Sequence, residues 1–261
     1  MELSSTVSVI VAGGASGLGR ATALALAAVG CKVAIFDLNR DLGEKLACEI
    51  GGLFQLVDVS YLASIDAGLT EVAHTHGIAR VIVNCAGIAP AMKTVTRDRL
   101  TGAPFHHDLD VFAGVISVNL TGTFNLAAKA AAQMARLEGQ GPDHERGVIV
   151  LTSSIAAEDG QIGQVAYAAS KAGIAGMVLP MARDLAREGI RVVTIMPGIF
   201  KTPMLANLPA DIQDALGKTI PFPNRLGAPA EYADLVKSIV GNVMLNGCAI
   251  RLDGALRMPP R

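Results

Sequence analysis

The fold is decided near the N-terminus by the stretch Thr6-Val-Ser-Val-Ile-Val-Ala-Gly13-Gly-Ala-Ser-Gly17-Leu-Gly19. Residues 6–12 form a short apolar run that is typical of a buried strand. The glycines then indicate a turn, and the Ala- and Leu-rich residues 17–29 predict a helix. In such a unit the backbone N–H groups of the turn and the helix N-terminus can bind a pyrophosphate. Glycines also build plain turns, so the position between strand and helix is what favours a nucleotide site.

The same alternation continues along the chain. Further strands are predicted at residues 31–37, 53–57, 79–85, 147–151, 190–196 and 248–252, with helices between most of them, among them 63–76, 111–134 and 228–243. This order predicts an α/β fold: a single-domain, Rossmann-type, doubly wound parallel sheet. No linker divides the 261 residues, so we expect one domain over residues 1–261. Ligands of such sheets bind at the carboxyl ends of the strands, which here carry Gly13, Asp37, Asn84, Ser154 and Pro197.

Composition excludes several classes of function. The chain is 51% hydrophobic and 17% charged, which supplies a large core, and its net charge of −1 offers no attraction for nucleic acid or an anionic membrane. No apolar run approaches the ~20 residues of a membrane span, and no basic, apolar leader precedes the first strand. The four cysteines and five histidines lack metal-ligand spacing, so no metal is expected. We therefore expect a cytoplasmic protein that binds neither nucleic acid nor membrane.

Tyr167 and Lys171 stand four residues apart in Ala-rich sequence that favours helix, so they share one helix face. A free tyrosine has a pKa of about 10, and a nearby cation lowers that pKa, which suits Tyr167 to acid–base chemistry. Ser154 follows the apolar run of residues 147–151, where its hydroxyl could hold a carbonyl oxygen. A Tyr-x-x-x-Lys pair alone is common in ordinary helices, and the serine together with the nucleotide signature makes the catalytic interpretation the better one.

Asp37 ends the second predicted strand. A carboxylate at this position accepts hydrogen bonds from adenosine ribose hydroxyls and repels a 2′-phosphate. No lysine or arginine replaces Ser16 or directly follows Asp37, so NAD is favoured over NADP. The alternative role of Asp37 is an N-cap for the helix that starts near Asn39.

These residues resemble the short-chain dehydrogenase/reductase family over almost the whole chain. The resemblance implies a catalytic set of Ser154, Tyr167, Lys171 and Asn119, the last of which organises a water-linked proton path in that family. A buried asparagine that satisfies backbone groups at a helix irregularity is the simpler alternative for Asn119. The resemblance also implies NAD contacts from Gly13, Ser16, Gly17, Leu18, Gly19, Asp37, Asp58, Val59, Asn84, Ala86, Gly87, Tyr167, Lys171, Pro197, Gly198, Ile199 and Thr202.

The chain departs from the family pattern at Ala12, where threonine is usual, and at Cys85, where asparagine is common. The first change removes a side-chain hydrogen bond near the glycine turn. The second leaves Asn84, Ala86 and Gly87 in place. Without the resemblance, Asp58 would be interpreted as a turn or cap residue.

Longer stretches, among them Gly160-Gln-Ile-Gly-Gln-Val-Ala-Tyr167, resemble the branch of this family that interconverts 3-hydroxyacyl-CoA and 3-oxoacyl-CoA. The resemblance implies NAD as cofactor, an acyl-CoA alcohol or ketone as substrate, and a homotetramer. Gln161 and Gln164 are candidate substrate contacts. The alternatives are a dehydrogenase of a steroid or aryl secondary alcohol and, from another class, a protein that senses NAD without catalysis.

Two polar segments without a predicted strand or long helix complete the sequence. Residues 88–108 contain Lys93, Arg97 and Arg99, and residues 198–225 are expected to form a lid over the substrate that includes Lys201 and Lys218. These charges are either solvated loop residues or a surface that attracts the phosphates of CoA.

Overall fold

A parallel sheet forms the centre of the computed structural model, which describes residues 1–206 and 209–260. Within those residues its strands follow the order β3-β2-β1-β4-β7-β8-β9, all parallel. Their bounds are β1 (Ser8–Ala12), β2 (Lys32–Asp37), β3 (Leu53–Leu56), β4 (Val81–Asn84), β7 (Gly147–Thr152), β8 (Ile190–Pro197) and β9 (Ala249–Leu252). The predicted doubly wound parallel sheet is confirmed.

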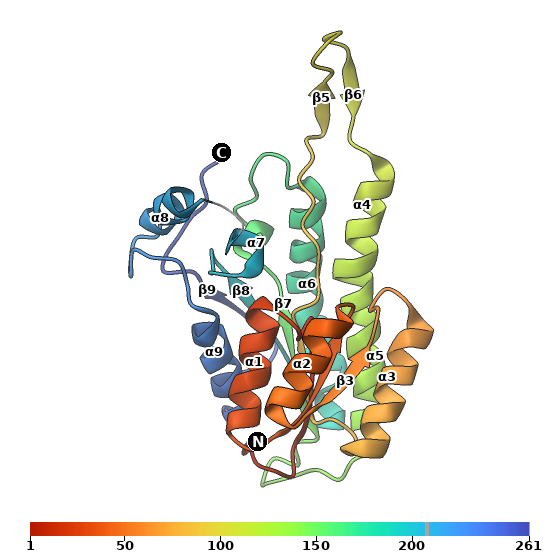
Figure 1. Cartoon of the computed structure of the whole chain (residues 1–261). Coiled ribbons are helices and arrows are strands. Elements are labelled where there is room, and N and C mark those ends of the chain that lie inside the picture. Colours follow the sequence, from red (N-terminus) through yellow and green to blue (C-terminus); the bar gives the residue numbers. More distant parts are fainter. Residues whose placement is uncertain (207–208, 261) are drawn as a thin grey trace.

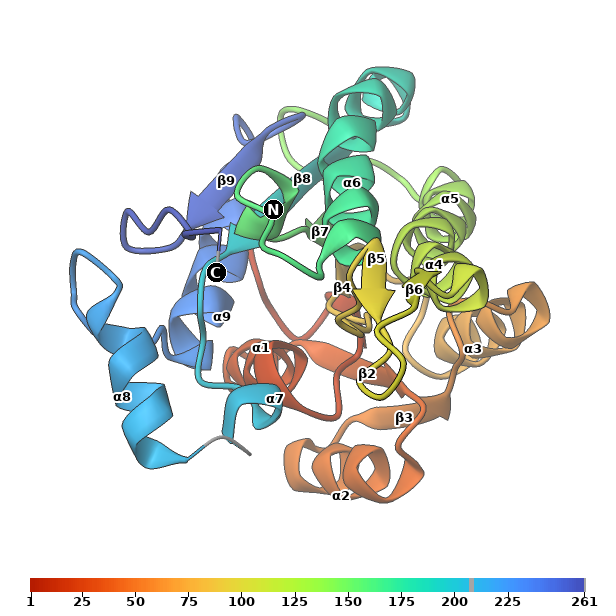
Figure 2. The same cartoon turned by 90° about the horizontal axis from the view of Figure 1, so that it is seen from above.

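Helices cover both faces of the sheet, which explains why the inner strands are apolar without alternation. One face packs against α3 (Leu62–Thr75), the continuous helix made of α4 (Leu109–Val115), η1 (Ile116–Thr121) and α5 (Gly122–Met134), and α6 (Val165–Asp184). The other face packs against α1 (Gly17–Ala28), α2 (Arg40–Ile50) and α9 (Pro229–Gly241). Two separate cores therefore hold the sheet from either side (Figure 2).

The strand order reverses at β1, which pairs with β2 on one side and with β4 on the other. Connections leave β1 and β4 in opposite directions, so a crevice opens where their carboxyl ends diverge. Gly13 and Cys85 directly follow these two strands. The crevice lies at the strand ends that the sequence marked as candidate ligand contacts.

Residues 88–108 are more regular than the sequence indicated. They contain an antiparallel hairpin of β5 (Val95–Arg97) and β6 (Pro104–His106), which projects beyond the helix layers (Figure 1). The Asp98 carboxylate holds the turn by accepting hydrogen bonds from the Leu100 and Thr101 N–H groups and from the Thr101 hydroxyl. The strands are only three residues long, too short for a period of two to stand out in the sequence.

The expected lid, residues 198–225, contains α7 (Pro203–Ala206) and α8 (Ala210–Lys218). Residues 207 and 208 of that segment lie outside the described residues. The helix expected around Tyr167 and Lys171 is α6, which ends at Asp184 and is followed by the short 3-10 turn η3 (Ala186–Glu188).

Two helical segments differ from the expectation that no apolar stretch approaches the length of a membrane span. Leu109–Met134 and Val165–Asp184 have the length and hydropathy of a membrane span. Both segments also contribute side chains to one core of the sheet. Core helices of proteins without a membrane span can have the same length and hydropathy. Length and composition alone therefore do not decide for a membrane.

Candidate active site

A cavity of about 770 Å³ occupies the crevice at the strand ends. It is lined by every candidate cofactor residue except Asn84, and by Ser154, Gln161 and Gln164 as well. Asn84 and Asn119 are buried behind its wall, 2% and 0% exposed. The structure thus brings residues that follow six strands to a single site, together with residues of helices that include α1 and α6.

The glycine turn of residues 13–19, the glycine cradle, packs too closely against neighbouring backbone to accommodate side chains at Gly13 and Gly19. Gly13 has a φ of +67°, and a Cβ there would lie 2.6 Å from the Ala86 nitrogen. A Cβ on Gly19 would overlap the Gly13 carbonyl oxygen. Ser16 precedes α1 in extended conformation and its side chain makes no capping hydrogen bond. The helix N-terminus therefore presents free N–H groups and its positive dipole end at the cavity, which fits a pyrophosphate.

Asp37 stands at the end of β2 and is tied to the glycine turn. Its carboxylate accepts hydrogen bonds from the Ala15 N–H and the Asn39 N–H, both at 2.9 Å. The helix α2 is capped by Asn39, which accepts from the Leu42 N–H, so Asp37 is not the N-cap. The carboxylate lines the cavity and keeps acceptor capacity for a ribose hydroxyl.

Asp58 holds a turn and also lines the cavity, while its contact with NAD stays a prediction. Its carboxylate accepts from the Ser60 N–H and hydroxyl, at 2.8 and 2.6 Å, so it holds the turn after β3. Asp58 and Val59 also line the cavity. These residues close the cavity on the side of β3.

Lys171 and Tyr167 lie together on α6, as their spacing predicts. The Lys171 ammonium lies 5.7 Å from the centre of the Tyr167 ring and donates a hydrogen bond to the Thr152 carbonyl at 2.8 Å. Burial lowers the pKa of Lys171 to about 8, an effect that the neighbouring Cys85 thiol partly opposes. At neutral pH the amine is therefore still mainly protonated.

The pKa of Tyr167 differs from the expectation. Burial raises the pKa of the phenol above its ordinary value, while its hydrogen bond with Ser154 acts in the opposite direction. The expected net lowering of the Tyr167 pKa is wrong for this structure, because the loss of hydration on burial outweighs the opposing effect of Ser154. The group is thus held in its protonated form, ready to donate a proton to a substrate oxygen.

Ser154 starts the turn η2 (Ile155–Ala157) directly after β7. Its hydroxyl oxygen accepts a hydrogen bond from the Ala156 N–H at 3.1 Å, which leaves the hydroxyl proton for a neighbour. Ser154 and Tyr167 both line the cavity, and the Ser154 hydroxyl is near enough to lower the pKa of the Tyr167 phenol, so the two groups lie at one end of the cavity.

Asn119 lies in the π-helical turn η1, where a helix irregularity frees backbone groups. Its side chain accepts from the Ile88 N–H and donates to the Ile88 carbonyl, both at 2.8 Å, and donates to the Ser170 hydroxyl at 3.0 Å. The amide thus clamps the loop after Gly87 onto α6. A direct place in a proton path stays a prediction, whereas the structural alternative accounts for every contact of this side chain.

Asn84 steadies the end of β4. Its amide donates to the Thr123 hydroxyl at 2.7 Å and accepts from the Ala86 N–H at 3.1 Å. The Asn84 side chain therefore supports the cavity wall from behind and is not itself part of the lining.

A cluster of buried hydroxyl groups beside Lys171 was not predicted from the sequence. The Thr152 hydroxyl donates to the Asn84 carbonyl at 2.6 Å and lies 2.7 Å from the Tyr232 hydroxyl. The Ser153 hydroxyl donates to the Lys171 carbonyl at 2.6 Å. The polar run Thr152-Ser-Ser154 after an apolar strand was an available signal, whereas nothing in the sequence connects Tyr232 of α9 with this site.

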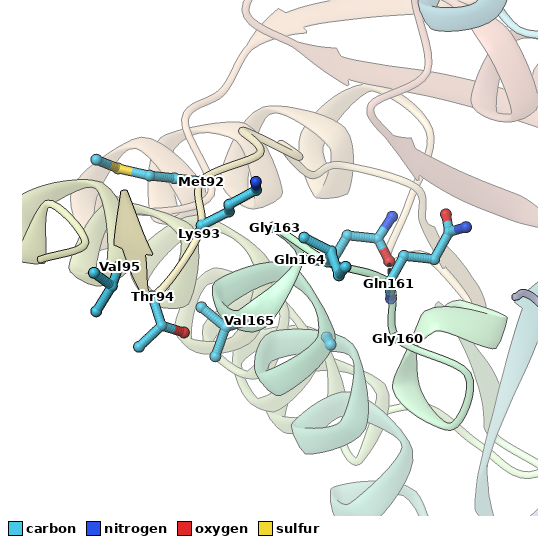
Figure 3. A pocket seen from close by; sticks show the side chains of 11 residues that line it. Met92, Lys93, Thr94, Val95, Gly160, Gln161, Gly163, Gln164 and Val165 are labelled. Atoms are coloured by element: carbon cyan, nitrogen blue, oxygen red, sulfur yellow. Dashed lines mark hydrogen bonds between the residues drawn. The ribbon is translucent and has the colours of Figure 1, made fainter. Parts of the chain in front are cut away.

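A second pocket of about 430 Å³ adjoins the substrate end of the cavity, since Gln161 and Gln164 line both. Figure 3 shows Lys93 on one wall and the two glutamines on the other. The Gln161 N–H donates to the Gln164 side-chain oxygen, and the Met92 N–H donates to the Gly163 carbonyl. The glutamines therefore stand at the junction of two connected spaces.

The site combines a glycine cradle, the Asp37 carboxylate on β2, and Ser154, Tyr167 and Lys171. This combination is typical of an oxidoreductase that uses a nicotinamide nucleotide. The family profile described as "short chain dehydrogenase" matches residues 7–213. The chain belongs to the short-chain dehydrogenase family and is an oxidoreductase.

The names of similar proteins are more specific than the family description. The chain is 49% identical over 253 residues to "3-hydroxyacyl-CoA dehydrogenase type-2" of Drosophila melanogaster, covering 96% of this chain and 97% of that protein. It is 48% identical over 255 residues to the human protein of the same name, covering 96% and 95%. A crystal structure of 3-hydroxyacyl-CoA dehydrogenase type-2 from Mycobacterium avium superposes with a TM-score of 0.91 at 41% identity, covering 98% of this chain and 97% of that one.

Proposed function

We propose that this chain is an NAD-dependent dehydrogenase that interconverts 3-hydroxyacyl-CoA and 3-oxoacyl-CoA. The observation that carries the proposal is the convergence of Ser154, Tyr167 and Lys171 on the cavity that also contains the glycine cradle. The names of relatives that are 48–49% identical over nearly the whole chain support the choice of substrate. A cytoplasmic location and a homotetramer stay predictions.

The residues of the chain have separate roles in this chemistry. Bound NAD or NADH supplies the acceptor or donor of a hydride. In the reducing direction the Tyr167 hydroxyl donates its proton to the 3-oxo oxygen, while the Ser154 hydroxyl holds that oxygen by a hydrogen bond. The Lys171 ammonium stabilises the phenolate that Tyr167 becomes. In the oxidising direction the phenolate accepts the alcohol proton.

NAD is the better fit of the two nicotinamide nucleotides. The Asp37 carboxylate lies at the cavity, and a 2′-phosphate beside it would meet like charge. Leu38, the next residue along the cavity wall, is 66% exposed and uncharged. Among the described residues of this part of the lining, Asp37 is acidic and Leu38 is uncharged, which supports NAD as the cofactor.

The second pocket gives the CoA part of the substrate a place to bind. Lys93 lines it and has no hydrogen-bond or ion-pair partner within residues 1–206 and 209–260. Arg97 lies in the projecting hairpin, where its guanidinium donates to the Gly102 carbonyl at 3.0 Å. Of the three cations in residues 88–108, Lys93 is therefore the one placed to attract an anionic arm that leaves the cavity past the glutamines.

We expect Lys93→Glu to raise KM for acetoacetyl-CoA about fivefold at low ionic strength without changing kcat, as an exposed ion pair stabilises by up to ~1 kcal/mol. Added salt should reduce this effect. The measurement is the initial rate of NADH oxidation with acetoacetyl-CoA, with a small ketone free of CoA, and with a steroid and an aryl ketone.

Arg99→Glu makes the same charge change in the turn of the hairpin and serves as the control, with a smaller effect on KM. If Lys93→Glu changes KM equally for acetoacetyl-CoA and for the small ketone free of CoA, the role of Lys93 is contradicted. Equal changes of KM in Lys93→Glu and Arg99→Glu contradict it as well. A wild-type protein that prefers the steroid or aryl ketone to the CoA ester contradicts the proposed substrate. Tight NAD binding with no turnover of any alcohol or ketone would instead support the NAD-sensing alternative.

A further inference from the structure

The last residues of the chain pass across the substrate end of the cavity. Leu256 is buried at 2% exposure and packs with Ile155, the neighbour of Ser154, and with Ile220 of the expected lid. Met258 packs against the same cluster and lines the larger cavity. Residues 253–260 therefore connect the catalytic turn with the lid.

The end of this segment is bonded to the loop that carries the two glutamines. The Gln161 side chain donates to the Pro259 carbonyl at 3.0 Å, and the Ile162 N–H donates to the Pro260 carbonyl at 3.1 Å. Proline has no N–H group, so these carbonyls are the polar groups that the segment offers here. The loop and the C-terminal segment form one wall.

Arg251 of β9 fixes the base of that wall. Its guanidinium pairs with Asp159 at 2.6 Å, with Asp253 at 2.7 Å and with Glu158. The same group donates to the Leu256 carbonyl at 3.0 Å. One side chain therefore links the C-terminal segment to the start of the glutamine loop.

Met258 is an apolar residue that this wall adds to the lining of the larger cavity. Met258 joins Leu205 and Leu216 in the lining of the larger cavity and does not line the pocket that contains Lys93. Met258 packs in the same cluster as Ile155, the neighbour of Ser154, so a hydrocarbon group attached near the reacting carbon can contact it. Methionine fills space flexibly, so its size at this position limits the group that fits.

We propose that Met258 is a specificity-determining residue that limits the length of the hydrocarbon group the site accepts, and that residues 253–260 hold it in place. The inference rests on the proposed function for the identity of the substrate. Beyond the proposed function, the inference identifies the residue that selects among 3-oxoacyl-CoA substrates by the length of their acyl chain.

The test is a series of 3-oxoacyl-CoA esters with four, eight and twelve acyl carbons, reduced by NADH. Met258→Ala should raise the ratio of kcat/KM for the eight-carbon ester to that for the four-carbon ester about tenfold, the size of effect that a few methylene contacts give. Met258→Phe should lower the same ratio. Met244→Ala is the matched control, since Met244 is 85% exposed and lies between α9 and β9.

A ratio that stays the same in both Met258 variants overturns the inference, provided that NADH titration shows an intact cofactor site. A wild-type protein that reduces none of the esters contradicts the proposed function. In that case, methyl ketones of matching chain length replace the esters. Met258→Ala must then shift their ratio as well, and an unchanged ratio overturns the inference.

Discussion

Replacement of Tyr167 by phenylalanine is expected to lower kcat/KM for ketone reduction by about 10²–10⁴-fold, the typical contribution of a positioned proton donor. The ring that fills the space beside Lys171 remains, and only the hydroxyl is lost. NADH affinity, measured by fluorescence titration, should change little, because the nucleotide is held mainly by the glycine cradle and Asp37. The reason for the large effect is that burial keeps this phenol protonated beside the Ser154 hydroxyl.

Tyr61→Phe provides the control. Tyr61 is 64% exposed, directly precedes α3 and does not line the cavity, so its variant should keep wild-type rates. A Tyr167→Phe enzyme with near-normal kcat would show that another group supplies the proton. Loss of activity in both variants to the same degree would point to a general loss of folding.

The double variant Asp37→Asn/Leu38→Arg is expected to lower the preference for NAD over NADP, expressed as a ratio of kcat/KM values, by about 10²–10³-fold. A unit charge about 4 Å from another contributes up to about 4 kcal/mol near a protein surface, and the variant removes a repulsive charge and adds an attractive one. Asparagine cannot accept from both the Ala15 and Asn39 N–H groups as the carboxylate does. The ratio cancels that structural cost because both nucleotides use the same turn.

Asp41→Asn removes an equal charge from the exposed first turn of α2, outside the cavity, and should leave the ratio unchanged. Comparable kcat/KM for NAD and NADP in the wild-type protein would contradict the assignment of Asp37. A double variant that keeps the full NAD preference would place the selectivity elsewhere in the cavity.

The sheet and its helices could be predicted from the sequence because their signals are local. Apolar runs such as that of β7 are continuous since both faces of the strand are buried, and Asn39 caps α2 as such residues do. The hairpin of β5 and β6 was missed because three-residue strands carry too few residues for a pattern. The π-helical turn at Asn119 was also hidden, although the notion of a helix irregularity there was among the alternatives.

The site was predictable where a residue acts through its position after a strand or along one helix face. Gly13, Asp37, Tyr167 and Lys171 are of that kind, and all line one cavity. Contacts between distant segments were not predictable. The Thr152–Tyr232 pair joins residues 80 positions apart, and the bonds from Gln161 to Pro259 join residues 98 apart. The direction of the Tyr167 pKa also depended on burial, which the sequence does not display.

On the proposed function, this chain moves a hydride between a nicotinamide and the 3-oxo carbon of an acyl-CoA. The most direct measurement uses NADH with deuterium at both C4 positions, acetoacetyl-CoA and the wild-type protein, followed by mass spectrometry of the product. We expect 3-hydroxybutyryl-CoA with one deuterium on carbon 3, and almost none of this product from Tyr167→Phe in the same time. Product without deuterium, or no product from the wild-type protein, would contradict it.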